Sequence, residues 1–253
     1  MKVTVLGCGH AGGVPSVSAG WGRCDPENPR NRRRRPSVLV EDGETTILID
    51  TSPDLREQLL GASVRRLDGV LYTHGHADHL HGIDDLRELN RAMQAPIDIY
   101  GDVDLLARIR ERFGYVLEPL DSQYYYKPVL TPHVVTERFR VGGVEVLPFV
   151  QDHGVCATLG YRIGDFAYST DAVNLDDAAF EALAGVRLWI VGALTNRPHG
   201  THAHVDKALA WIERVGPERA LLTHMSTSLD YCRLKARLPA HVEPGYDGMV
   251  IEL

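Results

Sequence analysis

The chain has 253 residues, of which 44% are apolar and 24% are charged. A chain of this size and composition buries enough apolar surface to fold as a globular protein, which excludes a mainly disordered state. The formal charge of −7 argues against long nucleic acid as a partner, because no global basic field would attract it. No apolar run approaches the ~18 residues of a membrane-spanning helix, so we expect no membrane contact.

The four cysteines, Cys8, Cys24, Cys156 and Cys232, are widely spaced and include no C-x-x-C pair. We therefore expect free thiols and a reducing, cytoplasmic location. Histidine is the unusual residue of this composition, since the chain has 12 and several lie close together.

The first predicted elements are a strand, a glycine-rich loop and a β-hairpin. The apolar run Val3–Leu6 ends in a loop that lacks the spacing of a P-loop. Two further apolar runs, Ser37–Val40 and Thr45–Ile49, are separated by a short glycine-containing turn and predict the hairpin. Ser52 and Pro53 then predict the start of a helix, as its cap and its first residue.

Helical and strand patterns alternate through the rest of the chain. Helices are predicted at Asp84–Met93, Asp102–Phe113, Asp176–Leu183, His204–Val215 and Leu229–Leu238. Strands are predicted at Ile97–Tyr100, Val141–Phe149, Thr158–Ile163, Phe166–Ser169, Leu188–Val191 and Ala220–Leu222. No repeat, linker or break in composition divides the sequence, so we expect one layered α/β domain over residues 1–253.

One short motif concentrates groups that bind metals. The apolar run Gly69–Tyr72 leads directly into a stretch with four such side chains within six residues: His74, His76, Asp78 and His79. Imidazole and carboxylate ligands suit Zn²⁺ and related divalent ions. Because the motif follows a strand, we expect it on a loop, where its side chains can diverge toward two adjacent ions.

This H-x-H-x-D-H motif resembles the signature of the metallo-β-lactamase superfamily. Four more positions fit the pattern of that superfamily in order: Asp50, His153, Asp171 and His224, all of which follow predicted strands. The resemblance covers most of the chain and implies a four-layer αβ/βα sandwich, with the metal site at one edge between its halves.

The resemblance also implies a set of ligands for two divalent ions, Zn or Mn. One ion would be held by His74, His76 and His153, and the other by Asp78, His79 and His224. Asp171 would bridge both ions together with a water or hydroxide, and Asp50 would orient the ligand loop from outside. Two such ions lower the pKa of a bridging water toward ~7, which makes it a nucleophile.

Two positions separate the subgroups of this superfamily. Lactam-hydrolysing relatives commonly have Cys at the position of Asp171, whereas phosphodiesterase relatives have a bridging Asp. Redox relatives have Glu at the position of His76. The residues present here favour hydrolysis of a phosphodiester.

Further segments resemble the phosphoribosyl cyclic phosphodiesterases of the carbon–phosphorus lyase pathway. They are Gly9–Pro15, Asn28–Arg33, Arg197–His202 and Gly245–Met249. The resemblance implies His202 as the group that protonates the leaving oxygen, so His202 and Asp78 are the expected catalytic residues. Expected substrate contacts are His199, His204, Arg30 and Arg32. The chain departs from the family pattern at Trp21–Pro26, where a single Cys24 replaces a cysteine-rich zinc-binding insert.

The sequence therefore predicts a dimetal hydrolase that acts on a small phosphodiester, either a cyclic ribose phosphate or a nucleotide. The alternatives are a thioester or lactone hydrolase with the same metal centre and a metalloprotein that binds a nucleotide without turnover. We expect a small phosphorylated substrate as the partner and, by analogy with relatives, a homodimer.

Overall fold

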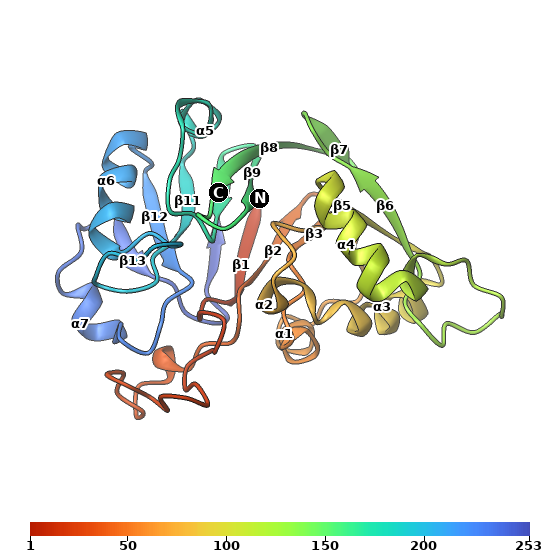
Figure 1. Ribbon diagram of the computed structural model, residues 1–253, viewed down its shortest axis with the longest axis horizontal. Helices are drawn as coiled ribbons and strands as arrows, with labels where there is room; N and C mark the ends of the chain where they lie inside the picture. Colours follow the sequence, from red (N-terminus) through yellow and green to blue (C-terminus); the bar gives the residue numbers. More distant parts are fainter.

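The computed structural model describes residues 1–253 as two seven-stranded sheets with helices on their outer faces (Figure 1). The first sheet has, in spatial order, β14 (Val250–Glu252), β1 (Lys2–Gly7), β2 (Ser37–Asp42), β3 (Thr45–Ile49), β4 (Gly69–Leu71), β5 (Ile97–Gly101) and β6 (Leu130–Val134). The second has β13 (Val242–Pro244), β12 (Arg219–Thr223), β11 (Leu188–Gly192), β10 (Phe166–Ser169), β9 (Ala157–Ile163), β8 (Val144–Asp152) and β7 (Phe139–Val141).

The helices divide between the two sheets in chain order. Those beside the first sheet are α1 (Leu55–Gly61), α2 (Ala77–Leu80), α3 (Leu86–Met93) and α4 (Val103–Phe113). Those beside the second are α5 (Asp177–Leu183), α6 (Val205–Val215) and α7 (Tyr231–Lys235). Short 3₁₀ turns are η1 (Pro29–Asn31), η2 (Ile83–Asp85) and η3 (Gly114–Leu117). This arrangement is the four-layer αβ/βα sandwich that the sequence predicts.

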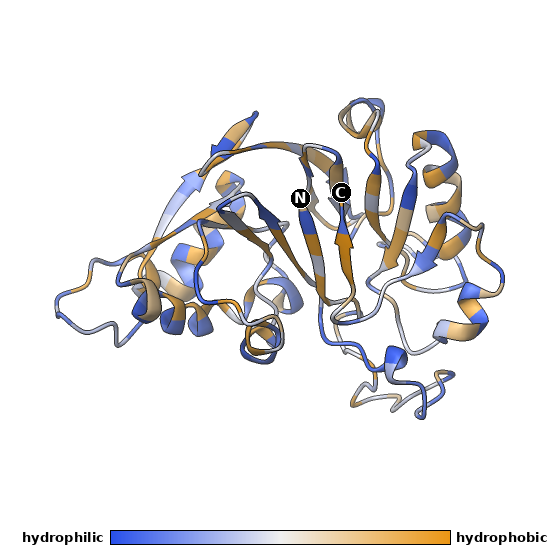
Figure 2. Cartoon of the chain, turned by 180° about the vertical axis from the view of Figure 1, so that it is seen from behind, coloured by the Kyte–Doolittle hydropathy of each residue, from blue (hydrophilic) through white to orange (hydrophobic).

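Successive side chains along a strand point to opposite faces of the sheet, and the apolar ones fill two separate cores. Ile47 and Ile49 of β3 point into a cluster of 42 buried residues that lies between the sheets and extends beneath α5 and α6. Leu48, between them in sequence, points the other way, into a cluster of 19 residues beneath α1, α3 and α4. Because the larger cluster takes residues from both sheets, it holds the two halves together. Apolar positions accordingly run along the strands in Figure 2, and the outer helix faces are polar.

The structure corrects two of the predicted elements. α1 begins at Leu55 rather than Pro53, because the Ser52 hydroxyl is engaged with the side chain of Gln58 and with the backbone of Asp54. The predicted strand Val141–Phe149 is two strands, β7 and β8, joined by a tight turn. That turn needs a left-handed backbone at Gly142, with φ of +54°, which glycine adopts without a steric cost.

The predicted hairpin of β2 and β3 is confirmed, with antiparallel pairing from Val38 opposite Ile49 to Asp42 opposite Thr45. Three strands, β6, β13 and β14, were not predicted because their apolar runs are short.

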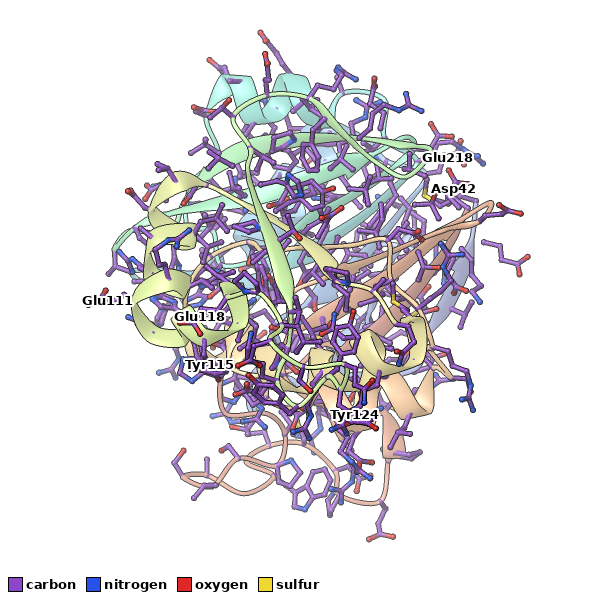
Figure 3. All side chains as sticks on the ribbon, turned by 90° about the vertical axis from the view of Figure 1, so that its right-hand side faces the viewer. Asp42, Glu111, Tyr115, Glu118, Tyr124 and Glu218 are labelled. Atoms are coloured by element: carbon purple, nitrogen blue, oxygen red, sulfur yellow. The ribbon has the colours of Figure 1, made fainter.

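A surface loop before β6 projects at the right of Figure 1 and includes the exposed Tyr124, which lies on the outer surface in Figure 3. None of the helices is long and apolar enough to cross a lipid bilayer.

The sheet topology brings several strand ends to one edge. β3 and β4 run parallel in the first sheet, and β10, β11 and β12 run parallel in the second. Loops at the carboxyl ends of parallel strands meet at the same edge, which is where α/β folds commonly place their sites. Asp50 and Thr73 follow β3 and β4, and Asp171 and His224 follow β10 and β12. The fold therefore collects these residues where the two sheets face each other.

Candidate metal centre

Asp171 lies at the middle of the site, with an imidazole facing each of its oxygens. Oδ2 is 3.6 Å from Nε2 of His74, 3.6 Å from Nε2 of His153 and 3.1 Å from Nε2 of His202. Oδ1 is 3.4 Å from Nε2 of His79 and 3.1 Å from Nε2 of His224. One carboxylate thus stands between two separate sets of histidines, and it is 3% exposed.

Asp78 provides a second carboxylate to one of these sets. Its Oδ2 is 3.2 Å from Nε2 of His79 and 3.3 Å from Nε2 of His224. The sequence placed the whole motif on a loop, but α2 begins at Ala77, so Asp78 and His79 lie in its first turn. Their neighbours His74 and His76 lie on the preceding loop, where Nε2 of His74 is 2.9 Å from Nδ1 of His76.

The donor atoms form two groups that share Asp171. The first donor group is His74, His76, His153 and Asp171, and the second donor group is Asp78, His79, Asp171 and His224. Within each group the ligand atoms lie within 4.8 Å of one another. The structure thus brings together the seven side chains for which the sequence predicts a ligand role, in two groups of the predicted composition. Sequence positions 74 to 224 supply them, so neither group exists until both halves of the chain have folded.

Asp50 holds the second donor group from outside. It is completely buried, and its Oδ2 accepts a hydrogen bond from Nδ1 of His79 at 2.7 Å. The backbone N–H of Thr73 donates to Oδ1 of Asp50 at 2.8 Å, and the Thr73 hydroxyl donates to Oδ2 at 2.9 Å. Burial raises the pKa of Asp50, although His79 and Thr73 oppose that rise. The contacts turn Nε2 of His79 toward the centre.

Two other imidazoles are oriented in the same manner. Nδ1 of His74 donates to the Thr73 hydroxyl at 3.0 Å, and Nδ1 of His153 donates to the carbonyl oxygen of Thr201 at 2.6 Å. A hydrogen on Nδ1 leaves the lone pair on Nε2, which is the form that ligates a metal. Thr201 was not predicted as a site residue, because a backbone carbonyl leaves no signal in a sequence.

Burial and neighbouring charge shift the pKa values of these groups in different directions. For His79, burial lowers the pKa, but the carboxylates of Asp78, Asp171 and Asp50 outweigh it and raise that pKa well above its usual value, so metal binding there displaces a proton. Burial lowers the pKa of His74, and the nearby His79 lowers it further. Burial also lowers the pKa of His153, whose ring therefore stays neutral. For Asp171, burial favours the neutral acid, but the imidazoles of His224 and His79 outweigh it and hold the pKa well below its usual value. Neutral imidazoles and ionised carboxylates are the forms that bind divalent ions.

The residues fit a pair of divalent ions. Ligand atoms about 2.0–2.1 Å from a tetrahedral Zn²⁺ lie roughly 3.3 Å from one another. The imidazole nitrogens and carboxylate oxygens of the second donor group lie 3.1–3.4 Å apart, which matches that spacing. Nε2 of His79 is buried and makes no hydrogen bond, a costly state for a polar atom unless it has a cation to face.

His202 and its neighbours border the centre. Nε2 of His202 faces Asp171, and Nδ1 lies 2.8 Å from the Thr201 hydroxyl. The ring of His199 lies 5.2 Å from that of His202, centroid to centroid, and His199 is exposed at the surface. His204 is instead the residue before α6, and neither ring stacking nor a side-chain hydrogen bond connects it to the centre.

The predicted substrate arginines have other contacts. The Arg30 guanidinium packs over the rings of Tyr231 and Tyr246, at 4.9 and 4.7 Å, and donates to the Tyr231 hydroxyl. Arg32 packs 5.1 Å over the ring of Trp21. The structure does not bring either side chain into the two donor groups.

His10, in the glycine-rich loop after β1, is a neighbour of the centre that was not among the predicted site residues. Its backbone N–H donates to the carbonyl of Met225, the residue after His224. Burial and the charge of His224 lower the pKa of His10 to about 4, so its ring is neutral. The only sequence signal for this residue is a single histidine in a loop, which most often has a structural role.

Comparison with known proteins places the chain in a family. The family model of the beta-lactamase superfamily domain matches residues 45–225, and the chain belongs to this family. Within it, the chain is similar over almost its full length to a diphosphatase from the PhnP family. That crystal structure has a TM-score of 0.91 and 33% identity, over 99% of this chain and 96% of the other. The sequence-based resemblance is thereby confirmed.

Other relatives show how widely the family varies. Zinc-bound PqqB from Methylobacterium extorquens has a TM-score of 0.78 at 19% identity over 100% of both chains, which is a likeness of fold alone. An octanoyltransferase of Porphyromonas gingivalis is 34% identical over 255 residues, which cover 98% of this chain and 51% of that protein. The chain spans about half or less of the curated relatives that it matches.

Proposed function

We propose that this protein is a dimetal hydrolase that cleaves a small phosphodiester, either a cyclic ribose phosphate or a nucleotide. The observation that supports this most directly is the Asp171 carboxylate, which lies between two histidine groups with Oδ1 facing one and Oδ2 the other. Structural zinc sites are closed and favour thiolate ligands, whereas these two groups contain only nitrogen and oxygen donors.

Each donor group would hold one divalent ion, Zn or Mn. When bound, such a pair lowers the pKa of a coordinated water toward ~7 and stabilises negative charge on phosphoryl oxygens. Asp78 and Asp171 offset two of the four positive charges, so the centre keeps a net positive charge for an anionic substrate. Asp50 fixes the ring of His79 by its 2.7 Å hydrogen bond, so that ligand needs no rearrangement when the substrate arrives.

His202 is the residue we propose for proton transfer. Nδ1 of His202 lies 2.8 Å from the Thr201 hydroxyl, and Nε2 faces Asp171 at 3.1 Å, so these contacts direct Nε2 toward the centre. His202 is also less buried than His74, His79 or His224, so a substrate oxygen can reach its ring. The protonated ring of His202 would donate the hydrogen on Nε2 to the leaving oxygen as the P–O bond breaks, and the imidazolium would return to neutral imidazole.

Phosphodiester cleavage is tested with bis(p-nitrophenyl) phosphate. We expect release of p-nitrophenol by protein loaded with Zn²⁺ or Mn²⁺, and loss of that activity after chelation of the metal. Reconstitution with each ion separately then identifies the metal that supports the faster turnover. Two bound ions per chain without any metal-dependent turnover would contradict the proposal.

Thioester or lactone hydrolysis is the second candidate. One observation favours it: the relative described as an octanoyltransferase, a name that denotes acyl transfer, aligns with 98% of this chain. A parallel panel of a phosphodiester, an acyl thioester and a lactone separates the two functions by kcat/KM. We expect the phosphodiester to be the best of the three, and a preference for the thioester would favour acyl chemistry instead. The cytoplasmic location and the homodimer stay predictions.

A further inference from the structure

A small hollow outside the two donor groups is lined by arginines that form no salt bridge. It has a volume of about 190 Å³, and the side chains that matter for its chemistry are Arg23, Arg233, Arg237, Asn196, Ser228 and Asp230. The volume is about six times the ~30 Å³ that a water molecule occupies in the liquid, which leaves room for a tetrahedral oxyanion.

None of the three guanidinium groups takes part in a salt bridge. The Arg237 guanidinium contacts only the side-chain oxygen of Asn196, and the side chains of Arg23 and Arg233 make no hydrogen bond at all. Elsewhere arginines commonly pair with carboxylates, as Arg35 does with Asp54 and Arg219 does with Glu243. Three unpaired cations around one hollow repel one another, and a bound anion would relieve that repulsion.

The single acid in the wall does not neutralise them. Oδ2 of Asp230 accepts hydrogen bonds from the backbone of Asp25 and from the side chain of Asn31, at 3.1 and 2.7 Å. Oδ1 of Asp230 accepts from the backbone N–H of Arg233 at 3.0 Å. The Asp230 oxygens are thus occupied by neutral donors, and three guanidinium charges against one carboxylate leave the hollow with two net positive charges.

The hollow is connected to the metal centre through two short segments. Ser228 lies four residues after the ligand His224, and Asn196 lies six residues before His202. The Ser228 hydroxyl approaches that of Thr195 at 3.4 Å, which joins the two segments. Asn196 and Ser228 of the wall therefore belong to segments that also carry His202 and His224, whereas the arginines come from the loop before η1, from α7 and from the residues after α7.

We propose that this hollow binds a phosphate group. Guanidinium forks match the oxygens of phosphate in pairs, and their bonds to an anion are stronger than bonds between neutral groups. The group could come from two sources, a second phosphate on the substrate or free inorganic phosphate. The first source rests on the proposed function, and the second does not.

The first experiment counts phosphate sites by calorimetric titration of inorganic phosphate into the metal-loaded protein. We expect the wild type to bind one more phosphate than the double variant Arg233→Gln/Arg237→Gln, or to bind it about tenfold or more tightly. The matched control is Arg187→Gln/Arg214→Gln, which removes the same charge from two arginines paired with Glu218 and Asp177. All four side chains lie at the surface, so these changes leave the cores intact.

The second experiment identifies the source. It compares thymidine 5′-(p-nitrophenyl phosphate) with the same diester carrying a 3′-phosphate. If the hollow takes a substrate phosphate, the added group lowers KM about tenfold in the wild type and the control but not in the Arg233/Arg237 double variant. If it takes free phosphate, the KM ratio is the same in all three proteins, and only the number or affinity of phosphate sites falls in the variant.

The proposal is overturned if the double variant and the wild type bind phosphate with the same stoichiometry and affinity and also show the same KM ratio. The titration requires no turnover. Absence of activity in every protein, with the extra phosphate site still present in the wild type, would therefore count against the proposed function and leave the hollow as a phosphate site.

Discussion

At the scale of single residues, Asp50 acts on the centre without belonging to either donor group. Its carboxylate accepts from His79 and twice from Thr73, so it fixes both a ligand ring and the start of the ligand loop. Removal of a residue that orients a metal ligand in this way typically lowers metal affinity by a factor of about 10–100. Replacing one carboxylate oxygen of Asp50 by an amide nitrogen therefore tests the orientation of His79 without changing any residue of the two donor groups.

Asp50→Asn keeps the size of the side chain but removes its charge. We expect the affinity for the ion of the second donor group to fall about 10–100-fold, because the ring of His79 loses its anionic partner. Metal content after dialysis against a competing chelator measures the change, with circular dichroism to establish that the variant is folded. Asp42→Asn, at an exposed carboxylate on β2, is the control. Equal metal affinity in Asp50→Asn and the wild type would contradict this role.

The proposed role of His202 predicts a kinetic effect without loss of metal. Because His202 faces Asp171 but belongs to neither donor group, His202→Ala should keep both ions and lower kcat about 10²–10⁴-fold. Metal analysis and steady-state kinetics on the same preparation measure both effects. His204→Ala, two residues away, should change neither by more than about twofold. A full complement of metal with unchanged kcat in His202→Ala would remove His202 from the mechanism.

Residue identities at strand ends could be predicted because their spacing is short and their chemistry is specific. His74, His76, Asp78 and His79 lie within one motif, and Asp171 and His224 each follow an apolar strand. The surroundings of Arg30 and Arg32 could not be predicted, because Tyr231 and Tyr246 are some 200 residues from Arg30 in sequence. Contacts between residues so far apart in the sequence produce no local pattern from which they could be predicted.

At the scale of elements, α1 is fastened to the segment before β2 by one ion pair. Oδ2 of Asp54 accepts from the backbone N–H and Nε of Arg35, both at 2.8 Å, and Oδ1 accepts from Nη2 at 2.6 Å. Gln58 of α1 donates to the carbonyl of Arg35 at 2.8 Å. Burial alone would raise the pKa of Asp54, but the hydrogen bonds and charge of Arg35 outweigh it and hold that pKa below its usual value.

This ion pair predicts a dependence of stability on pH. Since the pKa of Asp54 is lower in the folded chain, its contribution is complete above the unfolded-state pKa of about 3.9 and is lost as the pH falls through the folded-state value. Asp54→Asn should cost about 1 kcal/mol near pH 7, and this cost should shrink as the pH falls below about 3.9 and through the folded-state pKa. Urea unfolding from pH 2 to pH 7 measures the difference from the wild type. A difference that stays constant with pH would contradict the ion-pair explanation, and Glu57→Gln serves as a surface control.

Elements at the edges were harder to predict than those at the centre of each sheet. β3, β10 and β12 are central, and each has a continuous apolar run long enough to identify. β13 and β14 are edge strands of three residues, with a half-buried position in the middle of β13 and exposed positions at both ends of β14. The histidine motif was predicted as a loop, but its second part lies in α2, which begins at Ala77. A helix of four residues is too short for its apolar periodicity to be seen in the sequence.

At the scale of the whole molecule, the metal centre joins the two halves of the sandwich. His74, His76, Asp78 and His79 come from loops of the first sheet, and His153, Asp171 and His224 come from loops of the second. The core of 42 residues between the sheets also draws on both. Bound ions would therefore stabilise the contact between halves, and we expect the metal-loaded chain to unfold in one transition, consistent with the predicted domain over residues 1–253.

Removal of the metal should lower the unfolding temperature. A ligand present at about 100 times its dissociation constant adds about 2.7 kcal/mol, which corresponds to roughly 5–10 °C for a chain of this size. Calorimetry with and without chelator measures the shift, and added Zn²⁺ or Mn²⁺ should restore the higher temperature. The Asp171→Asn variant, which lacks the shared ligand, should not respond to chelator. An unchanged transition in the wild type would mean that no tightly held ion bridges the halves.

The backbone at the centre has a consequence for attempts to improve this protein. Asp50, Asp171 and His224 have φ of +63°, +48° and +56°, and they are three of the five non-glycine residues with left-handed backbone. Such a conformation costs a residue with a side chain about 1–2 kcal/mol relative to a relaxed backbone. Glycine would remove that cost at each position and would also remove a metal ligand or its support. Bound metal contributes about 2.7 kcal/mol, which is more than this backbone relief. Selection for heat resistance should therefore enrich glycine at Asp171 and His224 only in metal-free protein, and should retain both residues when the ions are present.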